Sequence, residues 1–486
     1  MTMVQEKTVL KNFIGGRWVD AEATGTAPVY NPATGEVIAE TPLSTAADVA
    51  RAVEAAKAAY ERWRKVPVIK RARLLYAYLE RLRREREALA RMITTEHGKS
   101  LADALAEVDR GIESVEHATA APTLMMGDAL AEVAEGLEQT TYRYPLGVVA
   151  SITPFNFPAM IPLWVIPWAV VTGNALILKP SEQTPMTTLR LVELLHEVGL
   201  PDGVVNVVNG AKEAVDALLA HPDIVAVNFT GSQKTAAYVY ETAARYGKRV
   251  QAFSGAKNHA VVLEDAVLAP TIDGILRAAF GNGGQRCMAT SVVVAVEGIA
   301  DDLVERLADG ARKLKVGSGF EEGVELTPLI REEHRRRVLS YIEEGEKQAR
   351  LVVDGREAMS RFPRGFYLGA TVFDRVTPEM RLWQEEIFGP VLSVVRVRDL
   401  DEAIAVTNRS RYANGAILYT QSGKAARRFR EEIDAGMVGI NVNIPLPVAF
   451  FPFGGHKDSF YGVIGENGKD IVQFFTRKKT VSSRWF

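Results

Sequence analysis

Between residues 44 and 97 apolar and polar positions alternate with the period of an α-helix. Apolar side chains recur at intervals of three and four over residues 44–64, at Val49, Val53, Ala56, Tyr60 and Trp63. This spacing predicts an amphipathic helix, which Ser44 or Thr45 is suited to cap. A second helix is predicted over residues 69–97, with its charged face in solvent and Gly98 as its C-terminal stop.

After residue 147 the pattern changes to short β-rich runs separated by helical stretches. The first series of predicted strands comprises residues 148–152, 175–178, 204–208 and 224–229. A second series begins near His259 and continues through residues 291–296, 416–419 and 438–441. This alternation is typical of βαβ units and parallel sheets, so we expect two α/β domains. Residues 139–144 and 474–482 are also β-rich but stand apart, and we expect them to pair as an arm between subunits.

The composition of this 486-residue chain is that of an ordinary globular protein with more than one core, with 47% hydrophobic and 24% charged residues. A net charge of −2 provides no basic field for nucleic acid or anionic lipid. Residues 1–11 are charged and have no apolar signal core. The apolar stretch 157–171 is too short to span a bilayer and contains three prolines, which predicts a buried segment. We therefore expect an enzyme of the cytoplasm, or of an organelle matrix if a transit peptide has been removed.

Cys287 is the only cysteine, and it ends a polar, glycine-rich stretch over residues 281–287. Glycines let the backbone approach a ligand closely, and the neighbouring Arg286 is expected to favour the thiolate. This setting favours a nucleophile over the alternative, an inert buried thiol. One cysteine excludes a disulfide framework. The seven histidines show no metal-binding spacing, so no metal site is predicted.

No Gly-x-Gly-x-x-Gly stretch links a strand to a helix, and residues 317–323 are interpreted as a plain loop. The predicted strand 224–229 instead leads through Gly231 and Ser232 into a helix, whose first amides can hold a pyrophosphate. Such a turn is also common for its geometry alone. Lys179 and Glu182 follow another strand and can bind the adenine ribose hydroxyls, with Glu182 disfavouring a 2′-phosphate. The alternative is an exposed ion pair.

Six segments in one order resemble the aldehyde dehydrogenase superfamily over nearly the whole chain: residues 154–158, 178–182, 229–232, 284–287, 385–390 and 452–455. The resemblance implies NAD(P)-dependent oxidation in which Cys287 attacks an aldehyde and Asn156, with the Cys287 amide, stabilises the oxyanion. The cofactor-binding residues that it implies are Phe155, Lys179, Glu182, Gly231, Ser232, Glu386 and Phe388.

Phe253 stands where hydrolytic members of this family have a glutamate that activates water. Without general-base help, typically worth about 10² to 10⁴ in rate, a thioester at Cys287 is expected to resist hydrolysis. The stretches 255–259, 285–289 and 482–486 resemble the methylmalonate-semialdehyde dehydrogenase branch. This implies oxidation of malonate or methylmalonate semialdehyde, loss of the carboxylate, and transfer of the acyl group to coenzyme A.

In that branch, arginines that match Arg110 and Arg286 bind the substrate carboxylate, a task that suits a guanidinium fork. For Arg110 an ion pair with Glu107 or Glu113, each three residues away, is an alternative. His259 is expected to support the fold. Phe450 and Phe451 are expected to pack in the core rather than line a pocket.

The predicted architecture is an α/β protein with three parts. A Rossmann-like NAD-binding domain comprises residues 1–122 and 146–254, an α/β catalytic domain comprises residues 255–465, and a small β oligomerisation arm comprises residues 123–145 and 466–486. A homotetramer is expected. Two other enzymes stay open, a CoA-acylating dehydrogenase of another short aldehyde and a hydrolytic enzyme with a different base. An idle NAD-binding structural protein is the alternative from another class, and the set Asn156, Cys287 and Glu386 argues against it.

Overall fold

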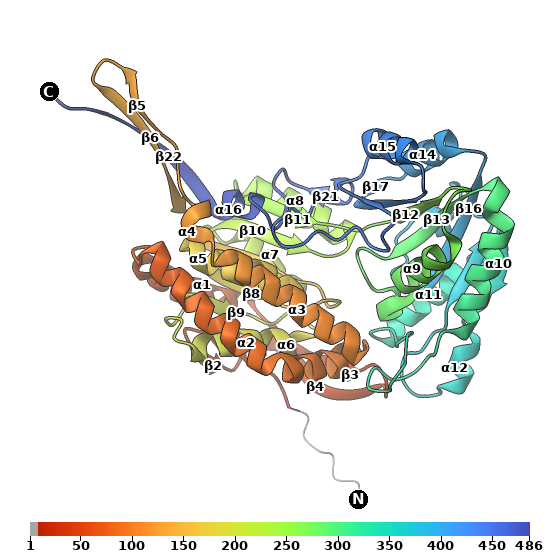
Figure 1. Cartoon of the computed structure of the whole chain (residues 1–486). Coiled ribbons are helices and arrows are strands. Elements are labelled where there is room, and N and C mark those ends of the chain that lie inside the picture. Colours follow the sequence, from red (N-terminus) through yellow and green to blue (C-terminus); the bar gives the residue numbers. More distant parts are fainter. Residues whose placement is uncertain (1–7) are drawn as a thin grey trace, which may run out of the picture.

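The computed structural model describes residues 8–486, which form two α/β bodies and a projecting arm (Figure 1). Residues 1–7, which include most of the charged N-terminal segment, lie outside the described part. The first body is built on an eight-stranded sheet in the order β2-β1-β9-β8-β7-β10-β11-β21. Its strands are β1 (Asn12–Ile14), β2 (Arg17–Val19), β7 (Val148–Ile152), β8 (Ala175–Lys179), β9 (Val205–Val207), β10 (Ile224–Thr230), β11 (Arg249–Phe253) and β21 (Phe460–Tyr461). The strands from β9 to β11 run parallel.

Helices cover both faces of this sheet. Those on one face are α1 (Ala46–Trp63), α7 (Lys212–Ala220) and α8 (Gln233–Arg245), and those on the other are α2 (Val68–His97), α3 (Leu101–Ala118), α5 (Met160–Thr172) and α6 (Pro185–Glu197). Along β8, Leu176 and Leu178 join one core while Ala175 and Ile177 join the other. This two-residue alternation follows from the pleat of a strand, and burial on both faces explains why the strand is apolar throughout.

The predicted helices are confirmed in this body. The helix expected over residues 44–64 is α1, with Thr45 at its N-cap, and the helix expected over residues 69–97 is α2. Gly98 ends α2 with a φ of +89°, a conformation that glycine adopts without strain. The apolar stretch 157–171 largely forms α5, and every residue of that helix is buried. Within residues 8–486 no helix combines the length and the apolarity needed to cross a membrane.

The second body contains a seven-stranded sheet in the order β14-β15-β16-β13-β12-β18-β19. Its strands are β12 (Asn258–Val262), β13 (Thr290–Val296), β14 (Arg350–Val353), β15 (Thr371–Asp374), β16 (Val391–Val397), β18 (Gly415–Tyr419) and β19 (Met437–Ile440). The flanking helices are α9 (Leu268–Phe280) and α10 (Glu297–Lys313) on one face and α11 (Glu332–Gly345), α14 (Leu400–Asn408) and α15 (Gly423–Glu432) on the other. The two predicted series of strands thus form two separate, mostly parallel sheets, and the α/β fold class is confirmed.

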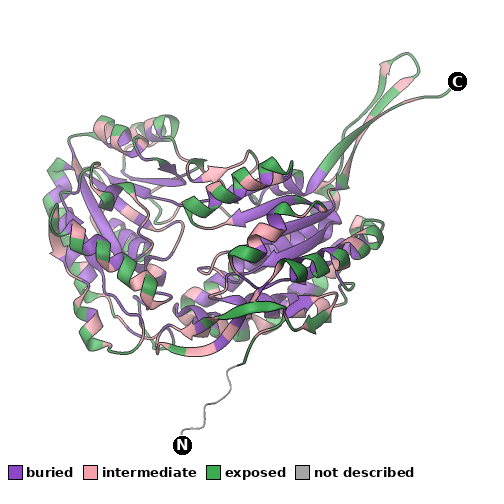
Figure 2. Ribbon diagram, turned by 180° about the vertical axis from the view of Figure 1, so that it is seen from behind, coloured by how far each residue is buried: buried purple, intermediate pink, exposed green. Residues whose placement is uncertain are grey.

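The arm is a three-stranded antiparallel sheet of β5 (Ala129–Ala134), β6 (Leu137–Pro145) and β22 (Thr476–Arg484). It projects from the first body and is largely exposed, whereas both central sheets are buried (Figure 2). The predicted β-rich segments do pair with each other, from Thr476 opposite Pro145 to Arg484 opposite Leu137. The expectation that Phe474 belongs to this strand is wrong, because Phe474 and Phe475 end the buried helix α16 (Asp470–Phe475) in the core of the first body.

A second difference concerns the C-terminal part of the predicted 255–465 domain. Strand β21 pairs with β11, so it forms an edge of the first body's sheet although it falls within the range predicted for the second domain. The remaining elements are β3 (Ala23–Asn31), β4 (Glu36–Ser44), α4 (Ala121–Leu124), α12 (Glu357–Arg361), α13 (Arg381–Gln384), β17 (Tyr412–Ala413), β20 (His456–Lys457) and a 3₁₀ turn (Gly281–Gly284).

Candidate active site

A tight turn after α9 presents Cys287. Asn282, Gly283 and Gly284 have φ values of +58°, +62° and +71°, the left-handed region that favours glycine. A Cβ on Gly284 would lie 2.3 Å from the carbonyl oxygen of Gly389, so only glycine permits this approach to the segment 385–390. The turn therefore carries Cys287 to the junction between the two bodies.

Two cavities meet at Cys287, which with Arg286 lines both of them. The first has a volume of about 180 Å³ and is lined by side chains of α3, α5 and the loop that follows β19. The second is a narrow space of about 20 Å³ on the side of Glu386 and Phe388. A reactant in the first cavity and a group held beside Glu386 can therefore both approach Cys287.

Arg286 favours the thiolate of Cys287, as expected, but other influences outweigh it. Burial, together with the negative charge of Glu386, raises the pKa of Cys287 to about 12, and the opposing influence of Arg286 is weaker. The Arg286 guanidinium is directed at Asp103, with Nη2 2.7 Å from Oδ1. The thiol is therefore protonated near neutral pH, and the reaction needs a group that removes its proton.

Asn156 lies beside the nucleophile turn in the loop that follows β7. Its side chain is buried, and its Nδ2 donates to the carbonyl oxygen of Gln285 at 3.1 Å. Two other amides hold the carbonyl oxygen of Cys287 itself: Asn258 Nδ2 donates at 2.9 Å and Asn414 Nδ2 at 3.1 Å. The sequence interpretation identified Asn156 but assigned no role to Asn258 or Asn414, which are distant in the chain and carry no local signal.

A buried ion pair behind Asn156 was also missed. The Lys99 Nζ lies 2.6 Å from Glu107 Oε2 and donates to the carbonyl oxygen of Asn156 at 2.6 Å. The other carboxylate oxygen of Glu107 accepts hydrogen bonds from the backbone amides of Ala159 and Met160, at 2.8 and 3.2 Å. The pair thereby fixes the Asn156 loop to α3 and caps the start of α5. The sequence did contain a sign of this charged cluster, because the spacing of Asp103, Glu107 and Arg110 places their side chains on one face of α3.

The predicted carboxylate-binding arginines both line the 180 Å³ cavity. Arg110 pairs with Glu113, with Nη1 2.7 Å from Oε2, and not with Glu107, whose partner is Lys99. The charged residues that line this cavity are Lys99, Asp103, Glu107, Arg110 and Arg286. Each of the three cations has a carboxylate partner, Lys99 with Glu107, Arg286 with Asp103 and Arg110 with Glu113. A small anionic reactant would therefore compete with Asp103 or Glu113 for an arginine that already faces the cavity.

The predicted nucleotide contacts lie at the carboxyl edge of the first sheet, where β8 and β10 flank β7. Lys179 is buried with its Nζ 2.8 Å from the Gly210 carbonyl oxygen and 3.7 Å from Glu182 Oε2. Ser232 is the N-cap of α8 and is exposed, and the amide of Gly231 donates to the Phe253 carbonyl oxygen at 3.1 Å. The carboxyl edge of a parallel sheet is the usual place for a dinucleotide.

Glu386 and Phe388 extend from the second body toward the first. Glu386 Oε1 accepts from the Ala256 amide at 2.9 Å, and burial raises the pKa of this carboxyl to about 7. Phe388, with a φ of +61°, sets its ring edge-on to Phe155 of the first body at 5.8 Å. A buried Lys257 lies nearby, and burial lowers its pKa to about 7. Of the predicted cofactor residues, Glu386 and Phe388 therefore line the narrow space at Cys287, and Phe155 contacts Phe388 from the first body.

Phe253 lies in an apolar cluster with Met160, Met288 and Phe453, against which Cys287 packs. The side chain at this position therefore offers no carboxylate that could activate water.

The expectation of core packing is wrong for Phe450 and Phe451, which are 58% and 63% exposed. His259 lies in β12 with its ring edge-on to Trp383. Within residues 8–486 no group of three or more His, Cys, Asp or Glu side chains is placed to hold a metal ion.

Comparison with known proteins matches residues 18–481 to the aldehyde dehydrogenase family. Malonate-semialdehyde dehydrogenase 2 of Shouchella clausii is 58% identical over all of both chains, and malonate-semialdehyde dehydrogenase of Bacillus cytotoxicus is 56% identical over 98% of each. Among solved structures, methylmalonate-semialdehyde dehydrogenase of Oceanimonas doudoroffii is 46% identical over 98% of each chain with a TM-score of 0.96. A Sinorhizobium meliloti protein solved with NAD is 43% identical over 99% of each chain with a TM-score of 0.97.

Proposed function

Because the chain belongs to the aldehyde dehydrogenase family, we propose that it oxidises malonate or methylmalonate semialdehyde with NAD and transfers the acyl group to coenzyme A. One observation carries the proposal: a small cavity lined by Arg110 and Arg286 meets the narrow space beside Glu386 at the sole cysteine. The names of relatives at 56% and 58% identity support the same substrate class.

In this proposal the Cys287 sulfur attacks the aldehyde carbon from within the 180 Å³ cavity. The Asn156 amide and the Cys287 backbone N–H stabilise the oxyanion that forms. The thiol proton must leave first, and Glu386, whose pKa is raised to about 7, is suited to accept it, directly or through water.

The donor and acceptor set fits NAD. Lys179 offers an ammonium group and Glu182 a carboxylate to the adenine ribose. Gly231 and Ser232 stand at the start of α8, whose first backbone amides suit a pyrophosphate. Glu386 offers a carboxylate to the second ribose. Phe155 and Phe388 would flank the nicotinamide. When bound, NAD supplies the hydride acceptor that turns the cysteine adduct into a thioester.

Release of the acyl group by coenzyme A is supported by the surroundings of Phe253. An apolar cluster stands where a water-activating base would be needed, so a thioester at Cys287 has no general base for hydrolysis at that position. The thiol of coenzyme A would displace Cys287 and restore the free enzyme. Loss of the substrate carboxylate as carbon dioxide or bicarbonate makes the product acetyl-CoA or propionyl-CoA.

The decisive experiment is NADH formation from malonate semialdehyde with and without coenzyme A. Without coenzyme A we expect a burst of about one NADH per active site followed by a slow phase, and with it fast turnover. Fast steady turnover to the free acid without coenzyme A would instead support a hydrolytic enzyme with another base. Absence of any aldehyde-dependent NADH would support an idle NAD-binding protein.

The substrate assignment is tested by the variant Arg110→Leu with propionaldehyde as the matched substrate without a carboxylate. Loss of one partner of a desolvated charge pair typically costs about 2–5 kcal/mol, so kcat/KM for malonate semialdehyde should fall by at least about 30-fold while propionaldehyde is nearly unaffected. An equal loss of kcat/KM for both substrates would mean that Arg110 has a structural role. A wild-type preference for propionaldehyde would favour another short aldehyde as the substrate.

We also propose that the arm joins subunits into a homotetramer. Its three strands are largely exposed in the single chain, which is costly for a long flat edge unless a second subunit covers it. The proposed location is the cytoplasm, or an organelle matrix, where NAD and coenzyme A are both available.

A further inference from the structure

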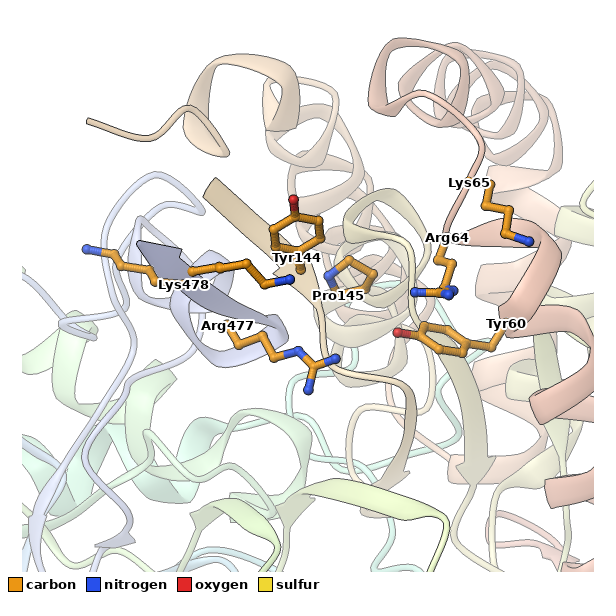
Figure 3. Close-up of a pocket in the computed structure, with 8 residues that line it drawn as sticks. Tyr60, Arg64, Lys65, Tyr144, Pro145, Arg477 and Lys478 are labelled. Carbon is orange, nitrogen blue, oxygen red and sulfur yellow. The ribbon is translucent and has the colours of Figure 1, made fainter. Parts of the chain in front are cut away.

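A third, larger cavity lies at the base of the arm, with a volume of about 620 Å³ (Figure 3). Its lining residues are Tyr60, Arg64, Lys65, Tyr144, Pro145, Arg477, Lys478 and Lys479. None of them lines either cavity at Cys287. Small-molecule sites typically have volumes of roughly 300–1,000 Å³, so this cavity is large enough for a ligand of its own.

Three elements bring these side chains together. Arg477 is opposite Tyr144 in the register of β22 and β6, so their side chains share one face of the arm, and Lys479 follows on the same face two residues later. The last turn of α1 faces this side of the arm and contributes Tyr60 and Arg64, which are neighbours at i and i+4 (Figure 3).

The positive charge of the cavity is almost unneutralised. Of its five cations, only Arg64 has a carboxylate within ion-pair distance among residues 8–486, Glu61 at 3.1 Å. The Lys479 ammonium lies 4.8 Å from the centre of the Tyr144 ring, and Arg64 lies 5.6 Å from that of Tyr60. Such contacts position the cations but add no negative charge. Because side chains alternate along a strand, Lys478 lies on the opposite face of β22 from Arg477 and Lys479. The cations that can face the space together are Arg64, Lys65, Arg477 and Lys479, and they favour an anion that carries several charges.

We infer that this cavity binds a small polyphosphate anion, at a site separate from the NAD and substrate sites. Guanidinium forks bind phosphate oxygens in bidentate fashion and ammonium groups act as point charges, while the tyrosine hydroxyls supply further donors. A single phosphate would leave most of the cations unpaired. The same chemistry is offered by an inorganic polyphosphate chain and by the phosphate tail of a nucleotide.

The test is calorimetric titration of the full-length protein with tripolyphosphate or ATP, at low ionic strength and with saturating NAD so that the nucleotide site is filled. We expect one binding site per chain, with an affinity that Arg477→Ala lowers by at least about tenfold. The matched control is Lys424→Ala, which removes an exposed lysine of α15 outside the cavity and should change nothing. Equal binding of both probes would identify the phosphates as the recognised group, and binding of ATP alone would identify a nucleotide.

Binding of neither probe, or equal affinity in wild type and Arg477→Ala, would overturn the inference. Lys65→Gln, on the opposite wall, is the second variant if Arg477→Ala is unstable. NADH formation by each variant is measured in parallel and should stay at the wild-type level, because none of the cavity residues contacts the Cys287 site. Failure of this site therefore cannot be confused with failure of the proposed function.

Discussion

The properties of single residues at this site are set by packing more than by sequence neighbours. Arg286 is adjacent to Cys287, yet its guanidinium lies on Asp103, and the thiol stays buried against an apolar cluster beside Glu386. The pKa of Cys287 rises to about 12 for these reasons. Burial and Glu386 therefore favour the neutral thiol over the thiolate.

Alkylation of Cys287 by iodoacetamide provides a direct check, because the chain has no other cysteine. Since only the thiolate reacts, and its fraction rises about tenfold per pH unit below the pKa, we expect the rate to climb without a plateau from pH 7 to pH 10. The measurement is adduct mass against time at each pH. A plateau below pH 9 would mean that the thiolate is stabilised after all. A glutathione control should level off near its own ordinary pKa.

Glu182 is predicted to set the choice of cofactor. Its partly exposed carboxylate lies 3.7 Å from Lys179 at the end of β8, where an adenine ribose is expected. A 2′-phosphate there would meet a like charge, at a cost of several kcal/mol. Wild type should use NAD far better than NADP, and Glu182→Ala should raise the kcat/KM ratio of NADP to NAD by about 10- to 100-fold. Glu193→Ala, on α6, is the control, and an unchanged ratio in Glu182→Ala would remove the assigned role.

At the scale of elements, the Lys99–Glu107 pair joins three segments that the sequence leaves unconnected. Both side chains are almost completely buried, with exposures of 1% and 0%. They connect the start of α3 to the Asn156 loop and to the first turn of α5. We expect Lys99 to act as a positioning residue, because it contacts the backbone of Asn156 rather than the reacting sulfur.

Lys99→Met should destabilise the protein by about 3–5 kcal/mol, since it leaves Glu107 buried without its cation. The double variant Lys99→Met/Glu107→Leu removes both charges and should recover much of that stability in urea unfolding. Its kcat should nevertheless stay low, because no group holds the Asn156 carbonyl, while NAD affinity is unchanged. Recovery of kcat together with stability would show that the pair is only structural.

At the scale of the whole molecule, the arm (residues 129–145 and 476–484) has no hydrophobic core of its own and is attached to the first body at its base, around Asn174. Asn174 Nδ2 donates to the Phe475 carbonyl oxygen at 2.9 Å, and its Oδ1 accepts from the amides of Leu146 and Gly147 at 2.7 and 3.0 Å. The end of β6 and the start of β22 are thus tied to the first body at one side chain. The strands beyond this point are free to meet another subunit.

Removal of residues 476–486 deletes β22 and exposes the edge of β6. We expect the truncated protein to form a smaller assembly than the full chain in light scattering coupled to size exclusion, while its affinity for NAD is retained. The matched control removes only residues 485–486, which follow β22, and should keep the full mass. An unchanged mass in the longer truncation would mean that subunits meet elsewhere.

Local patterns in the sequence predict many of the helices and strands of this protein. The three- and four-residue spacing predicts α1, and short apolar runs predict β7 and β8, because each element repeats its own period in the chain. The glycine-rich stretch before Cys287 identified the candidate nucleophile, since backbone freedom is a property of the residue itself.

Only the tertiary structure decided which side chains surround that nucleophile. Lys99 meets Asn156 across 57 residues, and Asn414 meets Cys287 across 127. The exposure of Phe450 and Phe451 and the burial of Phe474 likewise depend on which segments pack over them. Burial, ion pairing and pKa values come from contacts between distant segments, and a local period carries no information about those contacts.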